Sequence, residues 1–163
     1  MSSNNHNLPD PFNATVSGDA HVAIIQARWN GRITDELTRG CVATLKKHGL
    51  DDDQIDVFKV PGAVELTFGA SAAIETSAYD AVIVFGCVIR GETPHFDYVC
   101  QSVTQGVTHL NAECDVPVIF GLLTVNDEQQ ALDRIGGPAG HKGNEAAEAA
   151  LEMIQFAQEM KEI

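Results

Sequence analysis

A glycine-rich segment, residues 86–98, carries the residue types in this chain that could do chemistry. It follows the continuous apolar run 81–85 and holds two glycines and Thr93 ahead of His95. Glycines permit turns that point several backbone N–H groups at one anion, and a threonine hydroxyl adds a further donor. An imidazole exchanges protons near neutral pH, as an acid–base catalyst must. The segment predicts an anion site beside a proton-transfer residue; a glycine turn that serves only packing is the alternative.

Two further candidates lie earlier in the chain. Trp29, the only tryptophan, stands between Arg28 and Asn30 and could stack on a flat heterocycle, or it could be an ordinary anchoring aromatic. Glu65 ends the run Val-Pro-Gly-Ala-Val-Glu at residues 60–65. Its carboxylate could accept hydrogen bonds from a polyol, but a helix-start signal is the interpretation that the residues alone favour.

Three basic residues are candidates for binding an anion: Arg90, Arg134 and Lys142. Arg134 precedes Gly-Gly-Pro at residues 136–138, so its guanidinium could face an anion as a bidentate donor. A charge at the end of a short helix is an equally good interpretation of the same residue.

Apolar runs and amphipathic segments alternate along the chain, which predicts an α/β fold. Thr34 before two acidic residues predicts a helix start, as does Asn126, and Gly49 predicts a helix end. The expected fold is a three-layer α/β/α sandwich with a four-stranded parallel sheet, flavodoxin-like. The predicted strands are 21–26, 54–59, 81–85 and 116–123, and the predicted helices are 34–48, 64–76, 96–112, 127–135 and 143–160.

Right-handed crossovers place the carboxyl ends of parallel strands along one edge of a sheet, where open α/β folds bind ligands. The segments 28–30, 61–63 and 86–95 follow the ends of the first three predicted strands, and residues 120–124 close the fourth. We therefore expect four loops to converge on one cleft.

The length and the charge of the chain limit its possible domain organisation and its possible binding partners. The chain has 163 residues, 44% of them hydrophobic, which suits one domain, expected over residues 19–163. Residues 1–18 are rich in Ser, Asn, Pro and Asp and are expected to form a flexible tail. With 23 acidic against 10 basic residues the net charge is −13. That charge repels nucleic acids and anionic membranes, so we expect neither as a partner.

The cysteines and histidines indicate no metal and a reducing compartment. No Cys-x-x-Cys pair occurs, and each cysteine lies in an apolar stretch, as reduced core thiols do. We expect a cytoplasmic protein without a metal site or a secretion signal. No apolar run approaches the roughly 20 residues that a membrane span requires. The four cysteines are Cys41, Cys87, Cys100 and Cys114.

These motifs, in this order, resemble the lumazine synthase family. The resemblance runs from about residue 18 to residue 160. It is carried by Ala-Arg-Trp-Asn at 27–30, Val-Pro-Gly-Ala-Val-Glu at 60–65, the whole 86–98 segment, Pro-Val-Ile-Phe-Gly at 117–121 and Lys-Gly at 142–143.

The resemblance implies a transferase of riboflavin biosynthesis that needs no cofactor. In the penultimate step of that pathway, the enzyme condenses 5-amino-6-(D-ribitylamino)uracil with 3,4-dihydroxy-2-butanone 4-phosphate. The products are 6,7-dimethyl-8-ribityllumazine, phosphate and water. Two alternatives remain at this point: a related pentameric-type riboflavin synthase, which dismutates two lumazines, and a non-catalytic flavin-binding module.

The resemblance also implies a role for individual residues. His95 would shuttle protons, and Trp29 would stack on the pyrimidine. The ribityl chain would be held by Ala63, Val64 and Glu65. The heterocycle would be lined through backbone groups by Cys87, Val88 and Ile89, and it would be covered by Phe120 of an adjacent subunit. The butanone phosphate would be bound by Glu92, Thr93 and Arg134.

Finally, the resemblance implies a homo-oligomer with its sites between neighbouring subunits. The family forms pentamers, and in some bacteria twelve pentamers close into a shell of sixty chains. A short connection between the last two helices is linked to the shell, and Arg134 and Lys142 are close in this sequence. We expect a pentamer and favour the shell; riboflavin synthase is a candidate partner.

Overall fold

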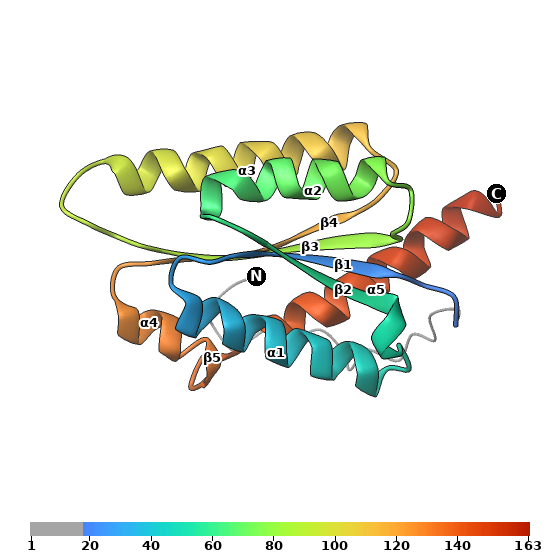
Figure 1. Ribbon diagram of the computed structural model, residues 1–163, viewed down its shortest axis with the longest axis horizontal. Helices are drawn as coiled ribbons and strands as arrows, with labels where there is room; N and C mark the ends of the chain where they lie inside the picture. The colour runs from blue at the N-terminus through green and yellow to red at the C-terminus, as the bar shows by residue number, and fades with distance from the viewer. Residues whose placement is uncertain (1–17) are drawn as a thin grey trace.

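The core of the molecule is a four-stranded parallel sheet in the order β2-β1-β3-β4 (Figure 1). The computed structural model describes residues 18–163, so the tail expected at residues 1–18 lies outside it apart from Gly18. The predicted three-layer, flavodoxin-like α/β/α class is confirmed. The strands are β1 (Val22–Ala27), β2 (Ile55–Val60), β3 (Ala81–Ile89) and β4 (Val118–Val125).

Helices cover both faces of the sheet (Figure 1). Along β1, Val22 and Ile24 pack in one hydrophobic cluster with α1 and α5, whereas Ala23 and Ile25 pack in the other with α2 and α3. Every residue of β1 is buried, as the near-continuous apolar run of a parallel strand requires. The helices are α1 (Gly31–Lys47), α2 (Leu66–Glu75), α3 (His95–Glu113), α4 (Glu128–Leu132) and α5 (Lys142–Lys161), with short 3₁₀ turns η1 (Asp52–Gln54) and η2 (Ala63–Glu65).

Strand β3 is longer than the sequence predicted, because it continues past residue 85 to Ile89. Gly86 was expected in a turn and lies inside the strand instead. A Cβ added at Gly86 would stand 2.7 Å from Leu122 Cδ1 and 3.1 Å from Leu66 Cδ1. The glycine therefore serves close packing between the sheet and α2, and the expected anion-binding turn does not begin there.

The starts of two helices also differ from the predicted ones. Helix α1 begins at Gly31, and Asn30 is its N-cap, so Thr34 is buried within the helix and does not cap it. Helix α4 is capped one residue later than expected, because the Asp127 side chain accepts a hydrogen bond from Gln130 N at 2.9 Å. Ser, Thr, Asp and Asn all suit this position, so local sequence leaves the exact cap open.

The predicted helix 127–135 is shorter and gives way to an antiparallel hairpin, β5 (Ile135–Gly137) and β6 (Gly140–His141). Gly136 and Gly140 adopt φ values of 111° and 82°, which residues with a side chain rarely take. The helix ends before these glycines, which form the hairpin that leads from Arg134 to α5.

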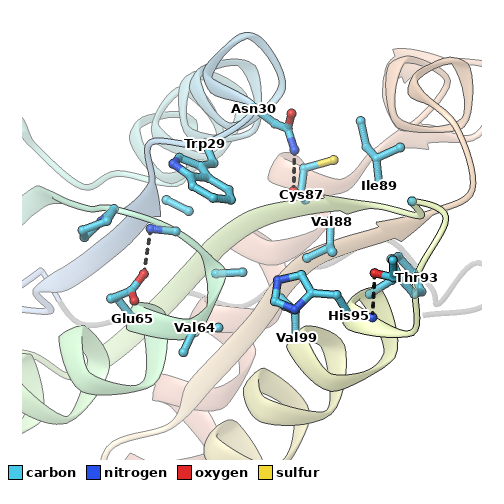
Figure 2. A pocket seen from close by; sticks show the side chains of 16 residues that line it. Trp29, Asn30, Val64, Glu65, Cys87, Val88, Ile89, Thr93, His95 and Val99 are labelled. Carbon is cyan, nitrogen blue, oxygen red and sulfur yellow. Dashed lines mark hydrogen bonds between the residues drawn. The ribbon is translucent and has the colours of Figure 1, made fainter.

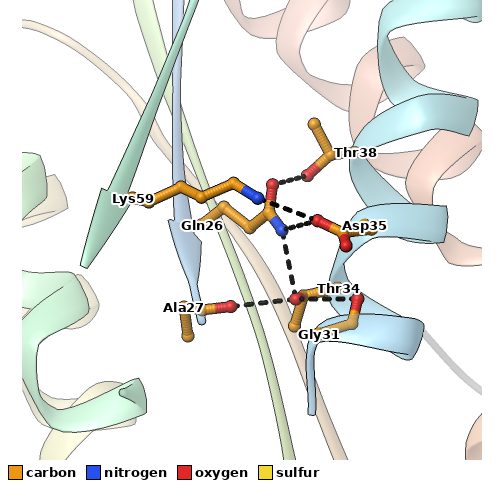
Figure 3. Close-up of polar contacts among 7 residues, drawn as sticks. All are labelled: Gln26, Ala27, Gly31, Thr34, Asp35, Thr38 and Lys59. Carbon is orange, nitrogen blue, oxygen red and sulfur yellow. Dashed lines mark hydrogen bonds and ion pairs between the residues drawn. The ribbon is translucent and has the colours of Figure 1, made fainter. Parts of the chain in front are cut away.

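A buried polar network joins β1 to α1 (Figure 3). Gln26, 2% exposed, donates from Nε2 to Thr34 Oγ1 at 3.2 Å and to Asp35 Oδ1 at 2.6 Å, and it accepts from Thr38 Oγ1 at 2.9 Å. The Thr34 hydroxyl donates in turn to the Ala27 carbonyl at 2.9 Å. The hydrogen bond from Gln26 is the main cause that lowers the pKa of Asp35. The network fixes the end of β1 against the start of the next helix.

Replacing Gln26 with methionine is expected to lower the free energy of unfolding by about 1–3 kcal/mol, since Thr38 then loses its acceptor in a buried position. Chemical denaturation monitored by circular dichroism measures this change. The same substitution at the exposed Gln101 on α3 is the control and should shift stability by less than about 0.5 kcal/mol. Equal effects at the two positions would contradict the role given to the network.

Candidate active site

A pocket of about 520 Å³ lies at the carboxyl ends of β1, β2 and β3 (Figure 2). The loops after β1, β2 and β3 meet there, as the topology of a parallel sheet predicts, whereas the fourth expected segment, residues 120–124, lies within β4 and lines a separate hollow. Its lining residues are Ala27, Trp29, Asn30, Pro61, Gly62, Ala63, Val64, Glu65, Cys87, Val88, Ile89, Gly91, Thr93, His95, Phe96 and Val99.

Trp29 forms one wall of this pocket and is 74% exposed (Figure 2). Its loop is fixed to the segment after β2, because Arg28 N donates to Val60 O at 2.9 Å and Trp29 N donates to Pro61 O at 3.3 Å. The indole does not fill a core gap in this chain. An exposed indole on a fixed loop is suited to stacking on a flat ring.

The end of β3 forms the opposite wall. Strand β1 last pairs with β3 at Gln26 and Phe85, whereas β3 pairs with β4 as far as Ile89. Arg90 N donates to Val125 of β4, so by the alternation of a strand the backbone groups of Ile89 point away from β4, toward the pocket side. An N–H and a C=O on this free edge of β3 can form hydrogen bonds with a planar ring that carries both acceptors and donors.

Cys87 lies on this edge, and its thiol is unsuited to covalent chemistry. Burial raises the pKa of Cys87 to about 11, and the negative charge of Glu128 adds to the rise. The thiol is therefore neutral near pH 7, and a neutral thiol is a poor nucleophile. What Cys87 offers the pocket is its backbone.

Glu65 closes a short turn beside the pocket. Its Oε2 accepts a hydrogen bond from Gly62 N at 2.9 Å, and the 3₁₀ turn η2 leads directly into α2. The helix-start interpretation of Glu65 is therefore correct as far as the chain itself is concerned. The same turn places Ala63 and Val64 on the pocket wall, so the carboxylate lies within reach of a ligand there.

His95 is the first residue of α3, exposed, and lines the pocket opposite Trp29 (Figure 2). Its backbone N donates to Thr93 Oγ1 at 3.4 Å. Gly91 and Thr93 line the pocket, while Glu92 between them does not. A helix start with a hydroxyl and backbone N–H groups near it favours an anionic group.

The predicted cations do not lie in this pocket. The Arg90 guanidinium stands 4.2 Å from the Phe96 ring centroid and pairs with Asp97 at 3.3 Å. Arg134 and Lys142 line a second hollow of about 330 Å³ on β4, together with Phe120. Within one chain the expected site residues therefore fall into two groups: those on β1 to β3 and the start of α3, and the pair Phe120 and Arg134.

Arg134 is partly held by its own helix, since its Nη1 donates to Gln130 O at 2.8 Å. Lys142 pairs with Glu145 at 2.8 Å. The guanidinium of Arg134 has further N–H donors, so a ligand can still be bound by it.

Sequence reasoning left seven lining residues out of the candidate set, among them Asn30, Phe96 and Val99. Val99 lies four residues after His95 on a helix, so helical spacing could have found it, whereas Phe96 directly follows His95 and adjacent helix positions do not share a face. Asn30 had a signal as well, because asparagine is enriched where a non-glycine residue takes a positive φ.

Neither a metal cluster nor a membrane-spanning helix is found in residues 18–163. No group of three or more His, Cys, Asp or Glu side chains in this part of the chain could hold a metal ion. Within the same residues, no helix combines the length and apolar character needed to cross a membrane.

Comparison with known proteins agrees with these features. A family model described as 6,7-dimethyl-8-ribityllumazine synthase matches residues 19–158. A protein of Phocaeicola vulgatus with that name is 49% identical over 158 residues, covering 96% of this chain and 94% of its own length. One of Bacteroides fragilis with the same name is 56% identical over 133 residues, covering 82% and 93%. This chain therefore belongs to the 6,7-dimethyl-8-ribityllumazine synthase family.

Proposed function

We propose that this chain condenses 5-amino-6-(D-ribitylamino)uracil with 3,4-dihydroxy-2-butanone 4-phosphate to give 6,7-dimethyl-8-ribityllumazine, phosphate and water. The observation that carries the proposal is one pocket with an exposed indole, the free backbone edge of β3 and an imidazole at a helix start. The first two suit a flat, hydrogen-bonding ring and the third suits proton transfer. Membership of the family supports the same reaction.

The pyrimidine substrate occupies the indole side in this proposal. Its ring stacks on Trp29, and its edge faces Cys87, Val88 and Ile89, where the backbone groups of Ile89 point away from β4 and can form hydrogen bonds with it. The ribityl hydroxyls lie along Ala63 and Val64 toward the Glu65 carboxylate, which accepts hydrogen bonds from them. These seven residues all line the one pocket.

The butanone phosphate occupies the end of the pocket nearest α3. The Thr93 hydroxyl, the N–H of Glu92 and the start of α3 bind its phosphate, and the Glu92 carboxylate turns outward. Arg134 supplies the cation. Since Arg134 and Phe120 lie in a separate hollow of the same chain, both are contributed by a neighbouring copy.

His95 carries the proton transfers. Addition of the ring amine to the ketone with loss of water, elimination of phosphate, tautomerisation and ring closure with loss of a second water each move a proton between a donor and an acceptor atom. One acid–base group gives about 10²- to 10⁴-fold acceleration, while alignment of two reactants can supply effective molarities of about 10⁵ M or more. Positioning therefore accounts for most of the acceleration.

The assembly proposed is a homopentamer, with the shell of twelve pentamers favoured, in the cytoplasm and with riboflavin synthase as a candidate partner. Exposed apolar side chains on several elements support burial against further copies: Val57 and Phe58 on β2, Phe68 on α2 and Tyr98 on α3. Light scattering measures the oligomeric state of the purified protein. Elution as a pentamer alone would reject the shell.

The reaction is tested by mixing purified protein with both substrates and following lumazine absorbance beside a protein-free control. Accelerated lumazine formation with stoichiometric phosphate release is the expected result. Folded, assembled protein that gives no acceleration would reject the proposal. Consumption of lumazine alone would then indicate the dismutase, and retained flavin without catalysis would indicate the binding module.

His95→Ala is expected to slow turnover by roughly 10²-fold without abolishing it, because positioning survives while one acid–base group is lost. Steady-state rates measure this loss. His109→Ala, at an exposed position on the same helix, should leave the rate unchanged. A folded His95→Ala protein no faster than the uncatalysed reaction would contradict the dominance of positioning.

Arg134→Ala is expected to cost more than His95→Ala and to raise the KM for the butanone phosphate, because the phosphate loses a charge-assisted, bidentate partner. Kinetics with each substrate varied in turn measure this. Arg39→Ala is the control, since Arg39 is exposed and, among residues 18–163, forms its ion pair within its own helix with Glu36. An unchanged KM for the butanone phosphate would argue against the assigned contact.

Co-assembly of Trp29→Ala with Arg134→Ala chains is expected to restore activity that neither variant has alone. If each site takes Trp29 from one copy and Arg134 from the next, random mixing of equal amounts leaves about a quarter of sites intact. Activity is measured after the mixed variants are unfolded and refolded together. Activity no higher than the mean of the two separate variants would show that the two residues act within one chain.

A further inference from the structure

We propose that Asn30 is a positioning residue for the aromatic wall of the pocket. Its side-chain amide ties the loop that carries Trp29 to the carbonyl of Cys87, and so sets the gap between the indole and the edge of β3. The inference rests on the proposed function, because the flat ring that fills this gap is the pyrimidine substrate.

The contact itself is short and long-range. Asn30 Nδ2 donates to Cys87 O at 2.7 Å, joining residues 57 positions apart (Figure 2). The distance is at the short end for an N–H···O hydrogen bond. Strand β1 last pairs with β3 at Phe85, so the Cys87 carbonyl lies beyond the register of its neighbour. The amide of Asn30 therefore takes the place that a further strand residue would occupy.

The backbone conformation of Asn30 orients this amide toward β3. Its φ and ψ are 56° and 43°, the left-handed region that asparagine tolerates better than most residues. The turn reverses the chain from β1 into α1, and the Asn30 carbonyl accepts from Ile33 N at 2.9 Å and from Thr34 N at 3.1 Å. One residue thus begins the helix with its main chain and reaches β3 with its side chain.

The rest of the loop is held from the other side. Arg28 N and Trp29 N both donate to the segment at the end of β2. Among the hydrogen bonds that residues 28–30 make within the described chain, only that of Asn30 Nδ2 crosses to β3. Loss of this bond frees the indole to move relative to the β3 edge while the loop stays attached to β2.

Two variants separate the tether from the turn. Asn30→Gly keeps the left-handed backbone and deletes the amide, whereas Asn30→Asp keeps the shape and replaces the donor with a carboxylate that faces a carbonyl. Ser77→Gly is the matched control. Ser77 is exposed, has the same φ of 56°, and does not line the pocket.

Two readouts are measured on the assembled protein. Acrylamide quenching of the single tryptophan reports the freedom of the indole without any substrate. Kinetics with each substrate varied in turn separate the KM values from kcat. Circular dichroism confirms that each variant is folded.

The tether predicts greater acrylamide quenching in both Asn30 variants. For Asn30→Gly it predicts a rise of about five- to tenfold in the KM for the pyrimidine, the range expected for one lost hydrogen bond. For Asn30→Asp the KM for the pyrimidine should rise further. The KM for the butanone phosphate should stay within about twofold, and Ser77→Gly should match the unaltered protein in both readouts.

Folded Asn30→Gly protein with unaltered quenching and an unaltered pyrimidine KM would overturn the inference. Equal rises in both KM values would overturn it as well, because they indicate general damage to the pocket. If the unaltered protein shows no lumazine synthesis, the proposed function fails, and the quenching comparison still decides whether Asn30 holds the indole.

Discussion

The pocket depends on the different lengths of two neighbouring strands. β1 ends at Ala27, while β3 runs on to Ile89, supported on its other side by β4. The Thr34 hydroxyl donates to the last carbonyl of β1 and accepts a hydrogen bond from Gln26 Nε2 (Figure 3). Because β1 stops there, the last residues of β3 present backbone groups to a ligand in place of a strand.

The fold and the convergence of loops could be predicted because apolar runs and strand order are local and topological signals. Three features could not. Gly86 reads as a turn residue until Leu66 and Leu122, both distant in sequence, are seen to pack against it. The tether from Asn30 and the hairpin after Arg134 likewise depend on partners and backbone angles that local sequence does not state.

The separation of the candidate residues into two hollows is itself informative. Local sequence placed Phe120 at the end of the fourth strand and Arg134 at the end of a short helix, and the fold puts both on the β4 side. In the proposed site a chain gives its indole and imidazole to one pocket and its arginine to the next. Under that proposal assembly is a part of the chemistry, since a lone chain would bind the pyrimidine without the cation for the phosphate.

The charge of the chain explains why that cation matters. A net charge of −13 opposes the approach of a phosphate ester, so binding depends on local donors that outweigh the overall field. Arg90 is engaged with Asp97 and Phe96, and Lys142 with Glu145. Arg134 bonds to a backbone carbonyl and to no carboxylate within the described residues, so its positive charge is not neutralised there. The cation best placed to bind phosphate is thus the one that a chain cannot supply to its own pocket.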